Sequence, residues 1–396
     1  MSITEPILKP DFQSRRRHFI FSDDHERLRE SIRAFVDREI VPHVEEWEET
    51  TFPDSIVRRM GDLGLLGLSV PEEYGGQGGD YFTNIVLAEE IARGGSGGLL
   101  MGLSVHTDMV IPPILKFGTE EQKRHWVTVG AAGRQVFCLA MTEPDAGSDL
   151  AGTSTRAVRD GDGWVINGSK TFITNGHRAG MVMLLTRTDS SAGHEGFTVF
   201  LVPMDTAGVI REKRLVKMGM HASDTALLAF QDVRVPGSAV LGEVGKGFYH
   251  IMWELQAERL IGAAGCLAYG QYAFDRALQY AQERAAFGRP IGTFQAVRQR
   301  LADAYTDVEA VRLTMWQAAW QLTAGQPAGT AIATAKFWAA DAGHRVAHTA
   351  VHIHGGVGID MDGEIHRYFA AAKHNEFALG GATAQLRRIG AALASS

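Results

Sequence analysis

Cysteine is scarce in this sequence, because its 396 residues include only Cys138 and Cys266. Two cysteines in apolar surroundings cannot form the disulfide framework that stabilises small secreted domains. We therefore expect both side chains to pack as reduced thiols in a cytoplasmic protein.

An excess of basic residues is also absent. The chain has 39 Lys and Arg against 46 Asp and Glu, which gives a formal net charge of −7. A negative balance disfavours nucleic acid as the main partner, because binding to phosphates depends on clustered positive charge. The one basic cluster, at residues 15–17, falls in a predicted N-terminal tail.

Long hydrophobic runs are missing as well. We expect no segment to reach the roughly 18 apolar residues of a membrane span, and the N-terminus has no apolar stretch of the signal-peptide type. These absences favour a protein with no membrane partner. Its length and its 45% apolar composition allow a sizeable buried core.

Hydrophobic spacing divides the chain into helical, β-rich and helical regions. A helical period runs through residues 23–49, and the sequence predicts further helices at 56–63, 82–92 and 119–127, separated by breakers such as 71–79 and 112–113. Short β-rich runs follow at 164–166, 182–186, 198–202 and 227–230. After Lys246 long Ala-rich helical segments return, with breaks near 288–292, 325–329 and 355–363.

This pattern predicts an α+β fold with four parts. They are an N-terminal tail (1–20), an N-terminal helical domain (21–134), a middle antiparallel β domain (135–242) and a C-terminal helical bundle (243–396). The glycine clusters at 94–98 and 242–247 do not lie between a strand and a helix of a βαβ unit. We interpret both clusters as loops, so the sequence predicts no Rossmann domain.

The string MTEPDAGSD at residues 141–149 follows an apolar run and is the most informative segment of the chain. Thr142 and Ser148 supply hydroxyls, and the small residues Ala146 and Gly147 let a polar ligand approach the backbone. The alternative is a polar turn after a strand, because Pro144, Asp145 and Gly147 are turn formers.

As a whole string, this segment resembles the first signature of the acyl-CoA dehydrogenase family. Further similar segments span residues 18–390 in order, and they read PEEYGG (71–76), FGTEEQK (117–123), NGSKTFITNG (167–176), KMGMHASDT (217–225), RAAFGRPIGTFQ (284–295) and HIHGGVG (352–358). The resemblance implies an N-terminal helical domain, a middle β domain and a C-terminal four-helix bundle, assembled as a homotetramer. It also implies FAD as cofactor, an acyl-CoA substrate and an electron-transfer flavoprotein as acceptor.

The same resemblance implies which residues bind the cofactor. Thr142 and Ser148 would contact the flavin and its phosphates, Thr174 would lie near flavin N5, and Phe172, at a position that is often Trp, would stack on the ring. A second group would reach the adenine and diphosphate end, partly from a neighbouring subunit. The full set is Met141, Thr142, Gly147, Ser148, Phe172, Thr174, Arg284, Phe287, Gln295, His352, Gly355, Gly356 and Thr383.

Some of these residues have simpler interpretations. Arg284 could pair with a surface carboxylate, and an aromatic residue such as Phe287 is more often part of a core. His352 stands where the family often has Gln, and we interpret it as a hydrogen-bonding group.

Family members need a carboxylate base to remove the α proton of the acyl group, and many carry it as Glu in a C-terminal string. Here that region reads LGGATAQL at 379–386. Alignment on Thr383 places Gly381 at the base position, whereas ungapped alignment on Lys373 places Leu379 there. Neither residue is a carboxylate, although the backbone N–H of Gly381 could still hold the thioester carbonyl.

A second base position in the family lies on a helix of the bundle, in members resembling isovaleryl-CoA and long-chain acyl-CoA dehydrogenases. Glu258 matches it, with Arg259 beside it. Helical spacing places Glu258 on a stripe with Leu255, Gly262 and other apolar residues, where burial would raise its pKa and suit it to a general base. The alternative for Glu258 is a structural ion pair with Arg259 or with a neighbouring helix. Arg259 would orient the C-terminal loop or the thioester, and its alternative is a surface or interdomain pairing.

The sequence therefore predicts FAD-dependent α,β-dehydrogenation of an acyl-CoA to the trans-2-enoyl-CoA, with Glu258, Arg259 and the Gly381 N–H as catalytic groups and no metal. An acyl-CoA oxidase or an acyl-carrier-protein dehydrogenase is the nearest alternative. A catalytically silent acyl-CoA-binding protein is a second one, favoured by Gly381 and opposed by Glu258. Chain length and branching of the acyl group do not follow from the position of the base.

Overall fold

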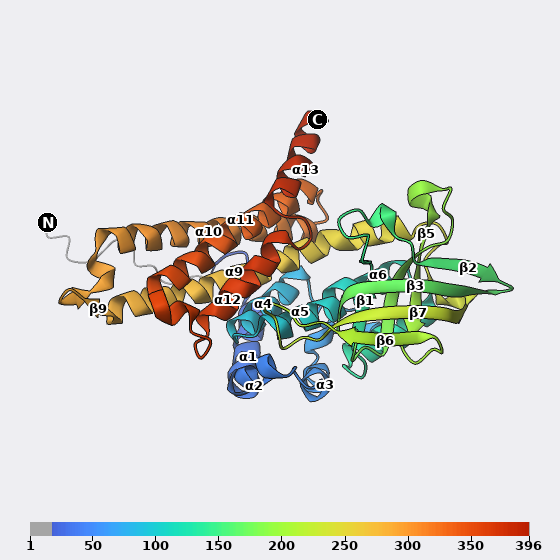
Figure 1. Cartoon of the computed structure of the whole chain (residues 1–396), viewed down its shortest axis with the longest axis horizontal. Helices are drawn as coiled ribbons and strands as arrows, with labels where there is room; N and C mark the ends of the chain where they lie inside the picture. Colours follow the sequence, from blue (N-terminus) through green and yellow to red (C-terminus); the bar gives the residue numbers. More distant parts are fainter. Residues whose placement is uncertain (1–17, 396) are drawn as a thin grey trace.

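The computed structural model describes residues 18–395, so residues 15–17 of the predicted tail lie outside it. Figure 1 shows an elongated molecule with a β-sheet at one end, a long helical bundle reaching to the other end, and the N-terminal helices between and below them. The N-terminal helices are α1 (Asp23–Glu39), α2 (Val44–Glu49), α3 (Asp54–Asp62), α4 (Tyr81–Arg93), α5 (Gly97–Ser104), α6 (Ile111–Phe117), α7 (Glu120–Gln122) and α8 (Thr128–Ala131).

Single turns and π-helical segments connect these elements. The π-helical segments are η5 (Val105–Val110) and η6 (Lys123–Val127). The 3₁₀ turns are η2 (Val41–His43), η3 (Leu65–Gly67), η4 (Glu72–Tyr74), η7 (Leu150–Gly152), η8 (Gly193–Gly196), η9 (Gly237–Ala239), η10 (Ile291–Thr293) and η11 (Gly355–Ile359).

The first predicted helix, at 23–49, is divided in the structure. The Ser22 side chain caps α1 by accepting a hydrogen bond from the backbone N–H of His25, and the His25 side chain accepts one from the backbone N–H of Ser22. The α-helix ends at Glu39, and α2 begins only at Val44, after a 3₁₀ turn that contains Pro42. The prediction of one continuous helix was wrong, because proline has no N–H to continue the hydrogen-bond ladder.

Helices α5 and α6 continue through η5 into one helical run, Gly97–Phe117, that we did not predict. Pro112 and Pro113 were predicted to be breakers, but they lie inside this run, directly after η5. A π-helical segment already departs from the i→i−4 hydrogen-bond ladder that proline interrupts. By length and composition this run could cross a membrane, which corrects the expectation that no segment is long and apolar enough. Its most apolar stretch is 78% buried inside the protein, as in the core helix of a soluble protein.

The middle region forms an eight-stranded sheet. The order is β6-β7-β3-β2-β4-β5-β8, and β1 also pairs with β4. Most neighbours are antiparallel, as predicted, but β1 and β2 each run parallel to β4. The strands are β1 (Phe137–Ala140), β2 (Arg156–Asp160), β3 (Gly163–Thr174), β4 (Met181–Arg187), β5 (Phe197–Pro203), β6 (Val209–Arg214), β7 (Thr225–Pro236) and β8 (Val240–Leu241).

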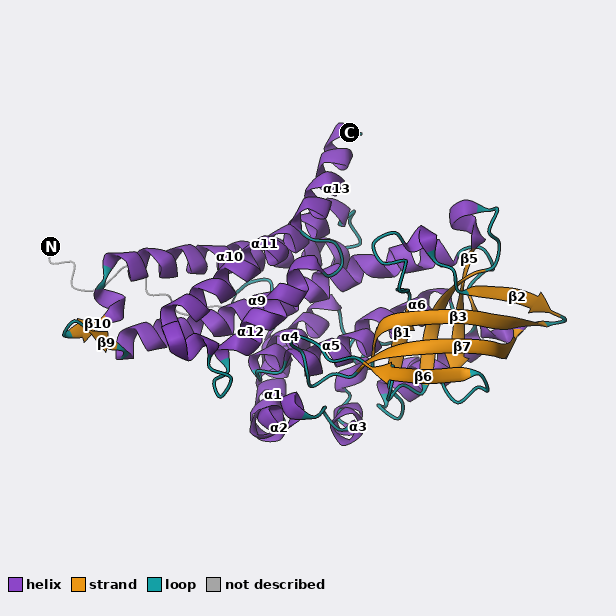
Figure 2. Ribbon diagram, in the orientation of Figure 1, coloured by secondary structure: helices purple, strands orange, loops and turns teal. Residues whose placement is uncertain are grey.

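The C-terminal region contains the expected four-helix bundle and a fifth helix. The bundle consists of α9 (Gly247–Glu283), α10 (Gln295–Thr323), α11 (Gly329–His354) and α12 (Ile365–Phe377). Helix α13 (Ala382–Ala394) projects away from it, with the C-terminus at its tip (Figure 1). A small hairpin, β9 (Ala285–Ala286) and β10 (Arg289–Pro290), lies at the end of the bundle opposite to the large sheet (Figure 2).

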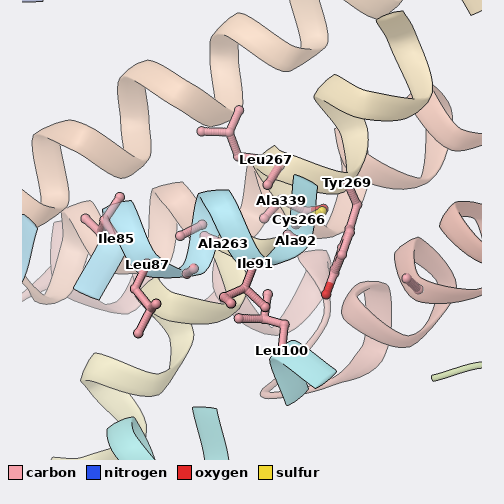
Figure 3. Close-up of a cluster of buried hydrophobic side chains, with 14 of the residues drawn as sticks. Ile85, Leu87, Ile91, Ala92, Leu100, Ala263, Cys266, Leu267, Tyr269 and Ala339 are labelled. Carbon is pink, nitrogen blue, oxygen red and sulfur yellow. The ribbon is translucent and has the colours of Figure 1, made fainter. Parts of the chain in front are cut away.

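A hydrophobic core joins the bundle to the N-terminal helices. Side chains of α4, α5, α9 and α11 meet in this core, among them Ile91, Leu100 and Cys266 (Figure 3). Small residues on α9 and α11 bring the two helices close, because a Cβ on Gly343 would lie only 2.2 Å from Cys266 Sγ. This close contact holds the middle of α9 in place.

Candidate active site

A cavity of about 180 Å³ lies where the three regions of the chain meet. Helix α5 and η5 form one wall, and β3 with the loop after β1 forms a second. The middle of α9, the end of α12 and the loop that follows α12 complete it. Met141, Thr142, Phe172, Thr174 and Glu258 all line this space, so the structure brings these five predicted site residues together.

The β wall of the cavity is held by a buried ion pair that sequence reasoning missed. Glu143, inside the MTEPDAGSD loop, is 2.9 Å from the Nζ of Lys170 on β3, and both side chains are almost fully buried. Glu143 also accepts hydrogen bonds from the backbone N–H groups of Ser154 and Thr155 and from the Ser154 hydroxyl. These partners outweigh the effect of burial and lower the pKa of Glu143 to about 2.

Strand β3 also fixes the two loop residues that line the cavity. The Lys170 ammonium donates to the carbonyl oxygen of Met141 at 2.7 Å, and the Thr171 N–H donates to that of Thr142 at 2.9 Å. The alternative of a simple polar turn is therefore insufficient, because the loop is bonded to β3 as a rigid wall of the cavity.

The structure also shows how well the β wall fits a flavin ring. Phe172 lines the cavity, yet 68% of it is exposed, and its φ of 60° lies in the left-handed region. A non-glycine residue in this region costs about 1–3 kcal/mol and persists only where its surroundings enforce it. An exposed aromatic face held in this way fits a planar ring, and Thr174 on the same strand adds a hydroxyl.

Gly147 and Ser148 lie outside the cavity, further along the loop. Both are exposed, and a Cβ on Gly147 would meet no atom within 4 Å. This open surface suits the polar phosphate part of FAD better than its ring.

The helical wall of the cavity carries Glu258. This residue is only 6% exposed, and its Oε2 has no hydrogen-bond partner within residues 18–395. Burial raises the pKa of Glu258 to about 7, with the negative charge of Asp108 acting in the same direction and Arg259 opposing it. A carboxylate with this pKa and a free oxygen can accept a proton near neutral pH.

Arg259 forms no ion pair with Glu258 in the described part of the chain. Its guanidinium donates to the carbonyl oxygens of Leu255, at 2.8 Å, and Leu379, at 3.2 Å. The alternative of a structural Glu258–Arg259 pair is thus not what the geometry shows, and Arg259 instead connects α9 to the loop before α13.

That loop places Leu379, and not Gly381, on the cavity. Leu379 has a φ of 60°, and a Cβ added to Gly262 of α9 would lie 3.4 Å from its side chain. Gly381 is the N-cap of α13, and among the described residues its N–H has no acceptor. Thr383 is exposed on α13 and does not line the cavity.

The remaining predicted cofactor residues lie at the far end of the bundle, and all of them are exposed. Tyr280, near the end of α9, stacks on His354, near the end of α11, so the termini of these helices lie together. The group consists of Arg284, Phe287, Gln295, His352, Gly355 and Gly356. Phe287 is 95% exposed with a φ of 52°, so it is not a core residue.

The far-end group is separated from the cavity by much of the length of α9. Glu258 and Arg284 are separated by 26 residues of α9, which corresponds to about 39 Å at 1.5 Å per residue.

Sequence reasoning also missed polar residues of the cavity, among them Asp108, His374 and Asn375. Asp108 lies in the π-helical segment η5 and accepts hydrogen bonds from the amide of Asn84 and the hydroxyl of Thr107. Burial raises the pKa of Asp108 to about 6 and lowers the pKa of His374 to about 4. An Asp within an otherwise apolar run was the only available signal, because a π-helical turn has no clear sequence signature.

Comparisons with known proteins agree with this architecture. The N-terminal, middle and C-terminal domain models of acyl-CoA dehydrogenases match residues 22–134, 138–233 and 245–394. The mitochondrial short-chain specific acyl-CoA dehydrogenase of Rattus norvegicus is 38% identical over 95% of this chain and 92% of its own length. The long-chain specific enzyme of the same organism is 39% identical over 89% of this chain and 83% of its own.

The solved structures give the same result. An acyl-CoA dehydrogenase from Geobacillus kaustophilus superimposes with a TM-score of 0.91 at 38% identity, covering 94% of this chain and 98% of its own. The family match therefore covers all three regions of the chain, including the sheet without a Rossmann unit. The chain belongs to the acyl-CoA dehydrogenase family, the FAD-dependent oxidoreductases that act on the CH–CH group of acyl-CoA thioesters.

Proposed function

We propose that this chain oxidises an acyl-CoA to the trans-2-enoyl-CoA with Glu258 as the base that removes the α proton. The observation that carries the proposal is the position of Glu258. It is a buried carboxylate with an unpartnered oxygen, and it lines the same cavity as the residues of the β wall. No ion pair within residues 18–395 uses its charge, and its pKa of about 7 is in the range of an effective general base.

Different residues of the chain have different roles in the proposed reaction. Phe172, Thr174, Met141 and Thr142 would hold the ring of FAD against the β wall. FAD held there would supply the oxidant for the hydride that leaves Cβ. Glu258 takes the α proton onto its carboxylate.

Two features of the cavity assist this proton transfer. The N–H groups of residues 379–381 have no acceptor in the described chain and are available to the thioester carbonyl, where they would stabilise the charge that develops. Arg259 holds this loop through the Leu379 carbonyl. The apolar wall of Leu100, Met109 and Ile261 excludes water, which strengthens both effects.

Replacing Glu258 with Gln tests the role of the base. Because Gln keeps the shape and cannot take the proton, we expect acyl-CoA to reduce the flavin about 10²- to 10⁴-fold more slowly. FAD content should be unchanged. Glu212→Gln, an exposed Glu on β6, is the control and should behave as the unmodified chain. Undiminished bleaching in Glu258→Gln would reject Glu258 as the base.

The second part of the proposal concerns the electron acceptor, the acyl carrier and the oligomeric assembly. We infer that an electron-transfer flavoprotein accepts the electrons and that the chain forms a homotetramer in the cytoplasm. The exposed far-end residues support a multimer, because much of the length of α9 separates them from the cavity of their own chain. Analytical ultracentrifugation tests the assembly, and a dimeric or monomeric holoenzyme would reject the tetramer.

Two measurements separate the alternatives. Peroxide formation, compared between CoA and acyl-carrier-protein thioesters, distinguishes the dehydrogenase from an oxidase or a carrier-protein enzyme. Flavin bleaching by a panel of straight and branched acyl-CoAs defines the substrate. A yellow protein that no thioester bleaches would identify the silent acyl-CoA-binding protein.

A further inference from the structure

A second buried glutamate lies directly beside the proposed base. Glu254 precedes Glu258 by one turn of α9, a spacing that brings side chains on one helix face within about 5–6 Å at Cβ. It is 1% exposed, and no donor within residues 18–395 bonds to either of its carboxyl oxygens. A buried carboxylate without donors is very costly, so Glu254 is a neutral carboxylic acid in the folded protein.

No basic or hydroxyl side chain of α4, α9 or α11 in the described residues bonds to Glu254. Arg259 of α9 uses its donors on the carbonyl oxygens of Leu255 and Leu379. Lys336 of α11 donates to the carbonyl of Asn375. The hydroxyl of Tyr81 on α4 donates to the carbonyl of Ala257.

The other titratable groups that line the cavity do not donate to Glu254 either. Asp108 of η5 is acidic and is already bonded to Asn84 and Thr107. His374 of α12 is kept neutral by burial, which lowers its pKa to about 4. The positive charge of Arg388 on α13 acts on Arg259, whose pKa it helps to lower. The carboxylate of Glu258 is therefore the acceptor available to a proton on Glu254.

We propose that Glu254 is a positioning residue, whose neutral carboxyl donates a hydrogen bond to the Glu258 carboxylate and leaves the other Glu258 oxygen free toward the cavity. This inference rests on the proposed function, because it assigns a role to Glu254 through the base. Burial, together with the negative charge of Glu258, raises the pKa of Glu254 well above its ordinary value, in agreement with a retained proton.

The arrangement accounts for two features of the site. A donated hydrogen bond stabilises the ionised form of Glu258, which opposes the raising effect of burial and of Asp108 on its pKa. The bond also limits rotation of the carboxyl group, so the base is oriented before the substrate enters. Neither effect requires a second ion in the cavity.

The pH dependence of flavin reduction in the holoenzyme tests this role. Glu254→Leu removes the donor, and a hydrogen bond to a charged group contributes about 1.5–3 kcal/mol, so we expect the acid limb to move up by about 1–2 pH units. Flavin reduction at pH 7 should fall by about 5- to 50-fold, because the ionised fraction of Glu258 falls from about one half. Glu254→Gln keeps a neutral donor and should retain an acid limb close to that of the unmodified chain.

Three outcomes overturn the proposal. They are an unmoved acid limb in Glu254→Leu, an equal shift in Glu254→Gln, and the absence of a protonated-carboxyl infrared band at pH 7 in the difference between the unmodified chain and Glu254→Gln. The infrared measurement also decides the question if Glu254→Leu does not fold. Failure of the proposed function gives a different result, because Glu258→Gln would then keep its activity whatever Glu254 does.

Discussion

The two walls of the cavity each carry a buried glutamate, and their environments are opposite. On the β wall, Glu143 is paired with Lys170 and bonded to Ser154 and Thr155, and its pKa is lowered to about 2. On the helical wall, Glu258 has no ion pair in the described chain, and its pKa is raised to about 7. Glu143 thus fixes the loop at 141–149, whereas the carboxylate of Glu258 is available to accept a proton.

The difference shows that burial alone does not define the role of a carboxylate. Both side chains are inaccessible to water, so desolvation raises the pKa of each. Donors decide the result, since Glu143 has several and Glu258 has none that satisfies its Oε2. The following predictions test this comparison.

Removing the partner of Glu143 should have the largest effect. Lys170→Met leaves a buried carboxylate unpaired, which costs about 3–5 kcal/mol of unfolding free energy. The Met141 carbonyl also loses its donor, so FAD should be retained poorly. Denaturant unfolding and the flavin absorbance measure both effects. Lys213→Met, an exposed Lys on β6, is the control, and an equal loss there would contradict the assignment.

Disturbing the packing behind Glu258 should have a smaller effect. In Gly343→Ala the new Cβ would lie 2.2 Å from Cys266 Sγ, so α9 and α11 must move apart. Overpacking of this kind costs about 1–3 kcal/mol and should also slow flavin reduction by displacing Glu258. Gly329→Ala, at the start of the same helix with nothing within 4 Å, should be nearly neutral. Equal stability of the two variants would show that the close contact is unimportant.

Glu143 and Glu258 should change the unfolding free energy with opposite dependence on pH. The lowered pKa of Glu143 stabilises the fold above about 4.5, and this contribution is lost as the pH falls toward 2. The raised pKa of Glu258 has the opposite effect. Its contribution to the unfolding free energy is present below pH 4.5 and is lost as the pH rises through 7. Unfolding of Glu143→Gln and Glu258→Gln at a series of pH values measures each. Curves that change with the same sign would contradict the comparison.

The far end of the bundle should show the smallest effect on folding. Arg284 is exposed, so Arg284→Ala should change the unfolding free energy of the apoprotein by no more than about 0.5 kcal/mol. It should nevertheless release FAD more readily on dilution of the holoenzyme. Lys213→Met serves as the control here as well. Unchanged FAD retention would remove Arg284 from the cofactor site.

Much of the architecture could be predicted from the sequence. The four predicted β-rich runs all lie in strands of the sheet, because runs of β-forming residues bounded by turn residues are a local signal. The helical periodicity after Lys246 likewise corresponds to the long helices of the bundle. The predicted helix boundaries were wrong at prolines. Pro112 and Pro113 lie in the first turn of α6, where we expected a break, and Pro42 interrupts the first predicted helix.

The candidate site was predicted in part. Met141, Thr142, Phe172, Thr174 and Glu258 line one cavity, but Leu379 lies where we expected Gly381, because the loop before α13 turns with left-handed residues whose register the sequence pattern does not show. The roles of these residues remain predictions.

By itself, the sequence determined the helical and β-rich regions, the loop at 141–149, the missing carboxylate at Gly381 and the presence of Glu258. These properties are local, since each depends on residue types and their spacing. Only the tertiary structure decided that Glu143 pairs with Lys170, that Asp108 faces the cavity and that Glu254 is left without a donor beside Glu258. The physical reason is that desolvation and charge pairing depend on groups far apart in the chain, which folding brings within a few ångströms.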